Sequence, residues 1–387
     1  MLEKYTTEIK IFFKRMGLFL LPIIILIVIL EYFSYTSGEL WPIKKVIAFQ
    51  NKAKEEVLFN RKVIDDEIAK YKYLNILERN LDILVIGSSR SMQIRQEMFS
   101  ERVKFYNAGG IIYNVGDMLD FINNLPVDKT PEMMILNVDF YWFGDKREVT
   151  RSISKALSEG DTVNKWESHL YANKYLLSNL LQKRNIFSEI IKGREKFEGL
   201  ISIGFQALDG NGFRHDGSYQ YGLYLSELRK NLEYYDRKSY LFRIENGISP
   251  FIRNSVYDSG KVEILEEFLK ICKSRGIKVI AFAPPMSTEI YEAVNESIYH
   301  KDLINNFRSN IGSIFAKYDY NYYDFTELRA FNLTDLYMFD GLHSTETAMA
   351  KILLEMSLTS DLEKILSHDL KSQLADEKTT PFEINWK

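Results

Sequence analysis

The segment of residues 81–91, Leu-Asp-Ile-Leu-Val-Ile-Gly-Ser-Ser-Arg-Ser, restricts the fold of this chain more than any other part of its sequence. Four of its five apolar residues, 83–86, form one run between Asp82 and Gly87, a composition typical of a strand buried on both faces. Gly87-Ser88-Ser89 follows directly and places two hydroxyl groups on the turn after this strand. Open α/β sheets carry their chemistry at the carboxyl ends of strands, so this turn is the first candidate site.

Helix and strand patterns alternate along most of the chain after this segment. The expected strands are 103–106, 132–138, 277–283 and 320–325, and the expected helices are 92–101, 115–125, 261–274, 303–318 and 345–366. Such alternation is typical of a parallel sheet with helices on both faces. We therefore expect an α/β fold, a three-layer α/β/α flavodoxin-like domain over residues 81–370, and a C-terminal tail of residues 371–387.

The alternation is interrupted over residues 141–256. This stretch contains two amphipathic helix patterns, 163–183 and 223–235, and a glycine-rich loop at 209–218. A long insertion with helices of its own is usually a cap or lid near a site. We expect a helical insertion over the C-terminal edge of the sheet.

An uncharged stretch near the N-terminus predicts a membrane anchor. Residues 16–30 carry no charge, and aromatic residues extend the apolar stretch to Tyr35, which gives about 20 residues for a hydrocarbon layer of about 30 Å. A cleaved signal peptide is the alternative, but no small-residue cleavage site follows, and residues 32–41 resemble an aromatic belt. We expect an uncleaved transmembrane helix over 16–35.

Charge predicts the orientation of this anchor. Lysine and arginine precede the span, so the positive-inside rule places residues 1–15 in the cytoplasm and the remaining chain outside the cell membrane. Residues 36–80 show apolar positions at helical spacing among charged ones and are expected to form an amphipathic helical linker of one or two helices.

Composition narrows the classes of ligand. A formal net charge of -3 gives no reason to expect nucleic acid as a partner. Cys272 is the one cysteine, which excludes an internal disulfide, and the five histidines are too widely spaced to suggest a metal site. We expect no metal and no cofactor. An aromatic content of 14% suits a protein that meets a membrane interface or a carbohydrate.

A serine nucleophile needs a base and an acid that orients the base. Asp340-Gly341-Leu342-His343 supplies both, in a loop before the last helix. We expect the Nε2 atom of His343 near hydrogen-bond distance of the Ser89 Oγ atom and Asp340 at Nδ1. Ser88 is the alternative nucleophile if its side chain points into the site instead.

Three segments together resemble blocks of the SGNH (GDSL-type) hydrolase superfamily: Gly87-Ser88-Ser89, Asn107-Ala108-Gly109 and Asp340-Gly341-Leu342-His343. Gly-Ser-Ser in place of the usual Gly-Asp-Ser resembles the membrane-anchored branch, which includes D-alanine transfer proteins of teichoic acid and polysaccharide O-acetylation proteins. The resemblance implies that Ser89 is the nucleophile, that His343 and Asp340 are its base and acid, and that the N–H groups of Ser89 and Gly109 bind the oxyanion.

The third block of the superfamily, Gly-x-Asn-Asp, is not reproduced. The equivalent strand end reads Leu136-Asn137-Val138-Asp139. Asn137 is the candidate for the third oxyanion donor, but this requires a register slip of one residue, which would send its side chain to the other face. Loss of one such donor costs about 100- to 1,000-fold in turnover in a well-studied protease.

Two arginines are candidate substrate contacts. Arg90 follows the expected nucleophile and could pair with an anionic substrate group, or it could be solvated after the turn. Arg214 lies in the loop Arg214-His215-Asp216-Gly217-Ser218, which we interpret as a lid or sugar contact. Adjacent side chains point apart, so this loop is not a second triad.

These features predict a serine esterase or O-acyltransferase that acts through an acyl-enzyme. A domain tethered outside the membrane favours a cell-envelope or exported polysaccharide as substrate or acceptor, and a membrane-bound acyltransferase is a candidate partner. The alternative, which draws on the missing third block and the large insertion, is a non-catalytic accessory protein that binds glycan or that acyltransferase.

Overall fold

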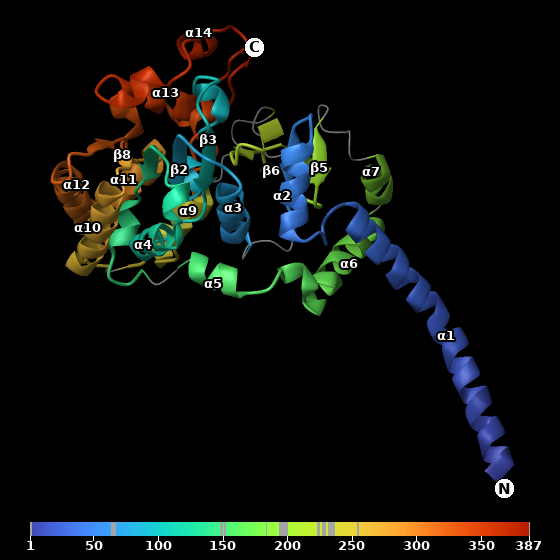
Figure 1. Ribbon diagram of the computed structural model, residues 1–387. Coiled ribbons are helices and arrows are strands. Elements are labelled where there is room, and N and C mark those ends of the chain that lie inside the picture. The colour runs from blue at the N-terminus through green and yellow to red at the C-terminus, as the bar shows by residue number, and fades with distance from the viewer. Residues whose placement is uncertain are drawn as a thin grey trace. The chain divides into compact units, whose positions relative to one another are not determined.

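A computed structural model describes residues 2–62, 67–147, 150, 152–182, 184–192, 200–222, 225–226, 230, 237–253 and 255–386. The chain forms two compact units, which are described separately: Met1–Ile64 with Gly160–Gly212, and Asp65–Glu159 with Phe213–Lys387. Figure 1 labels their helices and strands. The predicted linker of residues 36–80 and the predicted insertion of residues 141–256 stay predictions.

The elements of each unit are as follows. The first unit contains α1 (Leu2–Thr36), α2 (Ile43–Lys52), β1 (Val57–Phe59), α6 (Trp166–Leu181), α7 (Ile186–Lys192) and β5 (Ile201–Ile203), and β6 (Gly212–Phe213) lies at the boundary. The second contains α3 (Ile68–Leu77), β2 (Ile83–Gly87), β3 (Phe105–Gly109), α4 (Val115–Asn124), β4 (Met133–Asn137), α5 (Ile153–Ser158), β7 (Tyr219–Gln220), α9 (Arg237–Asn246), α10 (Ser259–Ser274), β8 (Lys278–Ala283), α11 (Thr288–Glu296), α12 (Lys301–Ala316), β9 (Asn321–Asp324), α13 (Glu346–Ser357) and α14 (Leu370–Leu374).

The second unit is built on a five-stranded sheet in the order β3-β2-β4-β8-β9. All its neighbouring pairs are parallel, and Ile86 of β2 lies opposite Ala108 on one side and Leu136 on the other. A mixed α/β fold with parallel sheets is therefore confirmed. Because the strands are parallel, β2, β4 and β8 end at the same edge.

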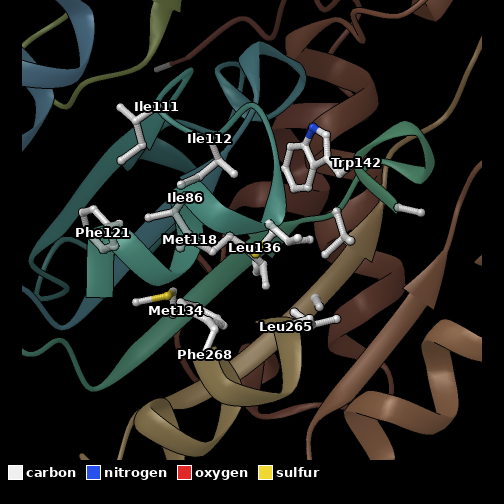
Figure 2. Packing of buried hydrophobic residues seen from close by; sticks show 14 of the residues in the cluster. Ile86, Ile111, Ile112, Met118, Phe121, Met134, Leu136, Trp142, Leu265 and Phe268 are labelled. Atoms are coloured by element: carbon white, nitrogen blue, oxygen red, sulfur yellow. The ribbon is translucent and has the colours of Figure 1, made fainter. Parts of the chain in front are cut away.

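Alternate residues of the strands pack into two cores on opposite faces of this sheet. Leu84, Ile86, Met134 and Leu136 face one core, to which α4, α10 and α12 contribute. Figure 2 shows Ile86 and Leu136 in this core with side chains of α4 and α10. The other core contains their strand neighbours and α13. Burial on both faces explains why the strands are continuous apolar runs in sequence.

Two sequence expectations differ from the structure here. Residues 92–101, predicted as a helix, contain only the short 3-10 turn Gln96–Met98, because the Gln96 N–H donates to the Asp216 carboxylate (2.8 Å) and distant groups hold the backbone. Residues 36–80 contain the strand β1 besides helices, since β1 pairs in parallel with the distant β5. Most of the predicted helix 223–235 lies outside the described residues.

The first unit carries the apolar helix. Within Thr6–Thr36 of α1, a stretch of 18 residues has a mean hydropathy of 2.6, and this is the one helix among the described residues long and apolar enough to span a membrane. Near its C-terminal end, Glu31 accepts hydrogen bonds from His169 (2.8 Å) and Asn173 (2.9 Å) of α6. These bonds fasten α6 to the end of the apolar helix.

Candidate active site

Three side chains form a continuous chain of hydrogen bonds at the carboxyl edge of the sheet. The Oγ atom of Ser89, which begins the 3-10 turn after β2, lies 2.7 Å from the Nε2 atom of His343. The Nδ1 atom of His343 lies 2.7 Å from the Oδ2 atom of Asp340. This is the relative placement expected from the sequence. A histidine held in this way can accept the serine proton while the carboxylate favours its charged form.

The loop that carries His343 is held by its own aspartate. Asp340 Oδ1 accepts the backbone N–H groups of Leu342 and His343, each at 2.8 Å. Burial would raise the pKa of Asp340, but the charge of His343 and these hydrogen bonds outweigh it and hold the pKa below its usual value. Asp340 is therefore an ionised carboxylate at neutral pH.

The two adjacent serines have different partners. The Ser88 hydroxyl donates to Asn137 Oδ1 (2.9 Å) and accepts the Arg90 N–H (3.3 Å) as the cap of the 3-10 turn. Ser88 is thus turned toward the neighbouring strand β4. Ser89, and not Ser88, presents its hydroxyl to His343.

Arg90 is buried, and its guanidinium is bonded to other groups of the protein. Its guanidinium donates to Asp139 (2.5 Å) and to the carbonyl of Leu342 (3.0 Å). It also donates to the carbonyls of Pro284 and Pro285, each at 2.7 Å. Arg90 thus joins the ends of β2, β4 and β8 to the His343 loop. It also lines the cavity beside Ser89 that is described below, and its contact with a substrate stays a prediction.

The predicted oxyanion donors are only partly available. Within the described residues, the Ser89 N–H has no hydrogen-bond partner. The Gly109 N–H donates to Asn107 Oδ1 at 2.7 Å, so it is committed to a side chain two residues away, contrary to expectation. Asn137 points its Oδ1 atom at the Ser88 N–H (2.7 Å), and its buried Nδ2 has no partner among the described residues.

A cavity of about 210 Å³ opens beside Ser89 and His343. Neither Gly109 nor Asn137 lines it. Aromatic side chains form much of its wall: Tyr113, Tyr141, Trp142 and Tyr240. Burial raises the pKa values of Tyr141 and Tyr240, and the carboxylates of Asp139 and Asp340 raise them further, so both phenols stay protonated.

Arg147 and Arg243 also line the cavity, and sequence reasoning missed both. Each follows a stretch with aromatic residues, but neither lies in a recognisable block. The Arg147 guanidinium donates to the Tyr113 carbonyl (3.3 Å) and the Ser249 hydroxyl (2.7 Å), and Arg243 donates to the Ser249 carbonyl (3.0 Å).

Arg214 and its loop do not line this cavity. Arg214 donates to the Ser218 hydroxyl at 3.3 Å. Asp216 accepts the N–H groups of Gln96 and Ser218, each at 2.8 Å, so the loop packs onto the chain that follows β2. The buried amine of Lys72 donates to the Gly217 carbonyl and to the Asn107 carbonyl (2.8 Å). Burial lowers the pKa of Lys72 to about 7.

Within the described part of the chain, no group of three or more histidine, cysteine, aspartate or glutamate side chains is arranged to hold a metal ion. Scans of this chain against protein-family models and against curated proteins found no match. The geometry of the site therefore has to carry the assignment of function.

Proposed function

We propose that this chain is a membrane-anchored SGNH-type serine esterase or O-acyltransferase that acts on cell-envelope or exported polysaccharide. The observation that carries the proposal is the Ser89–His343–Asp340 hydrogen-bond chain at the carboxyl edge of the sheet. The strand order supports the family. When the five strands are numbered by their order along the chain, they lie in the sheet in the order 2-1-3-4-5, as in flavodoxin-like folds.

The chemistry proceeds by two displacements. His343 Nε2 takes the proton of Ser89 Oγ as this oxygen bonds to the acyl carbon, and the Ser89 N–H binds the oxyanion. The imidazolium then gives the proton to the departing alcohol, which leaves an acyl-enzyme. Water or a sugar hydroxyl next loses its proton to His343 and attacks the acyl carbon. The bond between this carbon and Ser89 Oγ breaks, and His343 returns the proton to Ser89 Oγ.

The size of the cavity favours a short acyl group. At about 210 Å³ it is smaller than the range of about 300–1,000 Å³ typical of pockets for drug-sized ligands. An acetyl group or a small amino acid with part of a sugar is of suitable size, whereas a long fatty acyl chain is not. A glycan acceptor is consistent with the aromatic wall, because aromatic rings stack on sugar faces.

The location follows from α1. We propose that Thr6–Thr36 anchors the chain in the cell membrane with its basic N-terminus in the cytoplasm and the α/β domain outside. An enzyme tethered there meets envelope glycans or polysaccharide during export, and a membrane-bound acyltransferase that delivers acyl groups is a candidate partner.

Fluorophosphonate labelling of the full-length protein in detergent tests the catalytic proposal. A fluorophosphonate bonds covalently to a serine activated by a neighbouring base. We expect one label, on Ser89, that is lost in Ser89→Ala and retained in Ser88→Ala, the matched control. An unlabelled wild-type protein that unfolds cooperatively on heating would contradict the proposal.

A second candidate is a non-catalytic accessory protein that binds glycan or a membrane acyltransferase. The specific observation in its favour is that the Gly109 N–H already donates to Asn107. Of the two backbone N–H groups predicted to bind the oxyanion, the Ser89 N–H is then the one available. Glycan binding by wild-type and Ser89→Ala protein alike, without labelling of either, would favour this candidate.

A further inference from the structure

The arginines around the cavity differ in how their charges are balanced. Arg90 faces the carboxylate of Asp139 at 2.5 Å. Arg147 and Arg243 have no carboxylate partner among the described residues. Their hydrogen-bond acceptors there are two carbonyls and a hydroxyl, all neutral.

Burial makes this imbalance costly for Arg147. Its relative exposure is 6%, and a buried charge is stable only when it is paired and hydrogen-bonded. A guanidinium carries five N–H donors, and the protein accepts from Arg147 at Nε and one Nη atom. The remaining donors have no acceptor in the described structure.

The two guanidinium groups converge. Both donate to Ser249, Arg147 to its hydroxyl and Arg243 to its carbonyl, so one residue fixes the positions of both cations. The same cavity wall contains Trp142, whose indole N–H is buried and has no partner among the described residues. The lining of the cavity is therefore rich in donors and positive charge.

We infer that Arg147 and Arg243 form an anion-binding subsite beside Ser89, and that the molecule acted on carries a carboxylate or phosphate group close to its ester. The presence of an ester rests on the proposed function, whereas the presence of an anionic group rests on the positions of the two arginines. Arginine suits this role because its planar fork binds carboxylate and phosphate oxygens in pairs. The substrate class is thereby narrowed to acidic glycans, with uronate or phosphate groups.

Binding measurements on the full-length Ser89→Ala protein in non-ionic detergent test the subsite without turnover. The probes are galacturonate, its neutral counterpart galactose, and glycerol 3-phosphate, with affinities determined by NMR titration. We expect at least one anion to bind about 10-fold or more tightly than galactose, as charge-assisted hydrogen bonds are stronger than neutral ones. Preference for galacturonate or for glycerol 3-phosphate identifies a uronate or a phosphate polymer.

Substitution locates the site. Arg243→Gln, at a partly buried residue, is expected to weaken anion binding about 10-fold and to leave galactose binding unchanged. Arg147→Lys keeps the charge and should retain more anion affinity than Arg147→Gln. Arg329→Gln is the control, since this exposed arginine pairs with Glu292 outside the cavity.

Equal affinities for galactose and both anions would overturn the inference, as would anion binding that survives Arg243→Gln and Arg147→Gln in cooperatively folding protein. Failure of the proposed function is separable. A wild-type protein that takes no fluorophosphonate label while its Ser89→Ala form binds anions through Arg147 and Arg243 would retain the subsite and lose the catalytic role.

Discussion

Two buried basic residues of the α/β unit each hold a distant loop, but one of them is ion-paired and the other is not. Arg90 donates to the carbonyl of Leu342 and is paired with Asp139. Lys72 donates to the carbonyls of Asn107 and Gly217 and has no ion pair among the described contacts. A buried cation that is paired with a carboxylate keeps its charge at neutral pH, whereas a buried amine without such a pair can lose its proton there.

The surroundings of each cation account for the difference. Burial is the largest influence on Lys72 and lowers its pKa to about 7; Asp216 opposes this and Arg79 adds to it. Tyr106, whose own pKa is raised by burial, lies beside the amine with its ring centroid 5.6 Å away and supplies no negative charge at neutral pH. The loop of His343 is thus held by the ion-paired Arg90. The loop of Arg214 is held by Lys72, an amine that loses its proton near neutral pH.

The largest expected effect comes from Arg90→Gln. This substitution leaves Asp139 buried without a cation, a change that costs about 3–5 kcal/mol in comparable buried pairs. It also releases the Leu342 carbonyl beside His343, so we expect the rate of fluorophosphonate labelling to fall about 100-fold or more, on the scale of losing one positioned catalytic contact. Denaturant unfolding and labelling kinetics measure the two effects.

The double variant Arg90→Met/Asp139→Leu separates stability from positioning. Replacing both partners by apolar side chains should restore most of the free energy of unfolding, because no buried charge is left unpaired. Labelling should remain slow, since the Leu342 carbonyl still lacks its donor. Recovery of fast labelling would contradict the positioning role of Arg90.

The next effect is the pH dependence that Lys72 confers. Its pKa in the folded state is about 7 against 10.5 as the reference, so between these values the unfolded state binds more protons and stability rises with pH. We expect the wild type to gain about 3 kcal/mol relative to Lys72→Met between pH 7 and pH 10. The difference should stop changing below pH 7, where both states are protonated.

Denaturant unfolding at a series of pH values measures this difference. Lys273→Met is a suitable control, because Lys273 is exposed and pairs with Asp319 at the surface. Parallel curves for the wild type and Lys72→Met would show that Lys72 titrates normally and would remove the contrast with Arg90.

A smaller effect is expected from Asp216→Asn. The Asp216 carboxylate raises the pKa of Lys72, so its removal should lower that pKa further. The pH window over which stability rises would then begin at a lower pH. Asparagine has one acceptor oxygen, so it can accept the Gln96 N–H or the Ser218 N–H but not both, and we also expect a loss of stability that does not depend on pH. An unchanged pH window would show that the charge of Asp216 does not influence the pKa of Lys72.

Sequence reasoning succeeded where the determinants are local. The strands β2, β4 and β8 are short apolar runs, and the spacing of Asp340 and His343 lets one loop present both groups. It failed for β1, whose partner β5 lies far along the chain and leaves no periodic trace near residues 57–59. Residues 92–101 have an ordinary helical pattern, but the side chain of Asn107 and the Asp216 loop hold their backbone in another conformation.

The roles of individual side chains divide in the same way. The bond from the Gly109 N–H to Asn107 is a local turn that asparagine often makes, and the sequence contained the means to expect it. The burial of Arg90 and the convergence of Arg147 and Arg243 on Ser249 depend on contacts between distant segments, which no local pattern reveals.

Gly87, the last residue of β2, can be replaced by almost no other residue. Its φ of +155° is one that other residues rarely adopt, and a Cβ atom there would lie 2.5 Å from Asn137 Oδ1. Its carbonyl accepts the N–H groups of Gly110 (2.9 Å) and Ile112 (3.1 Å). In a saturation mutagenesis library selected for the activity of this chain, codon 87 should return almost only glycine, so the tolerance profile of a single position would report whether the turn before the serine is under selection.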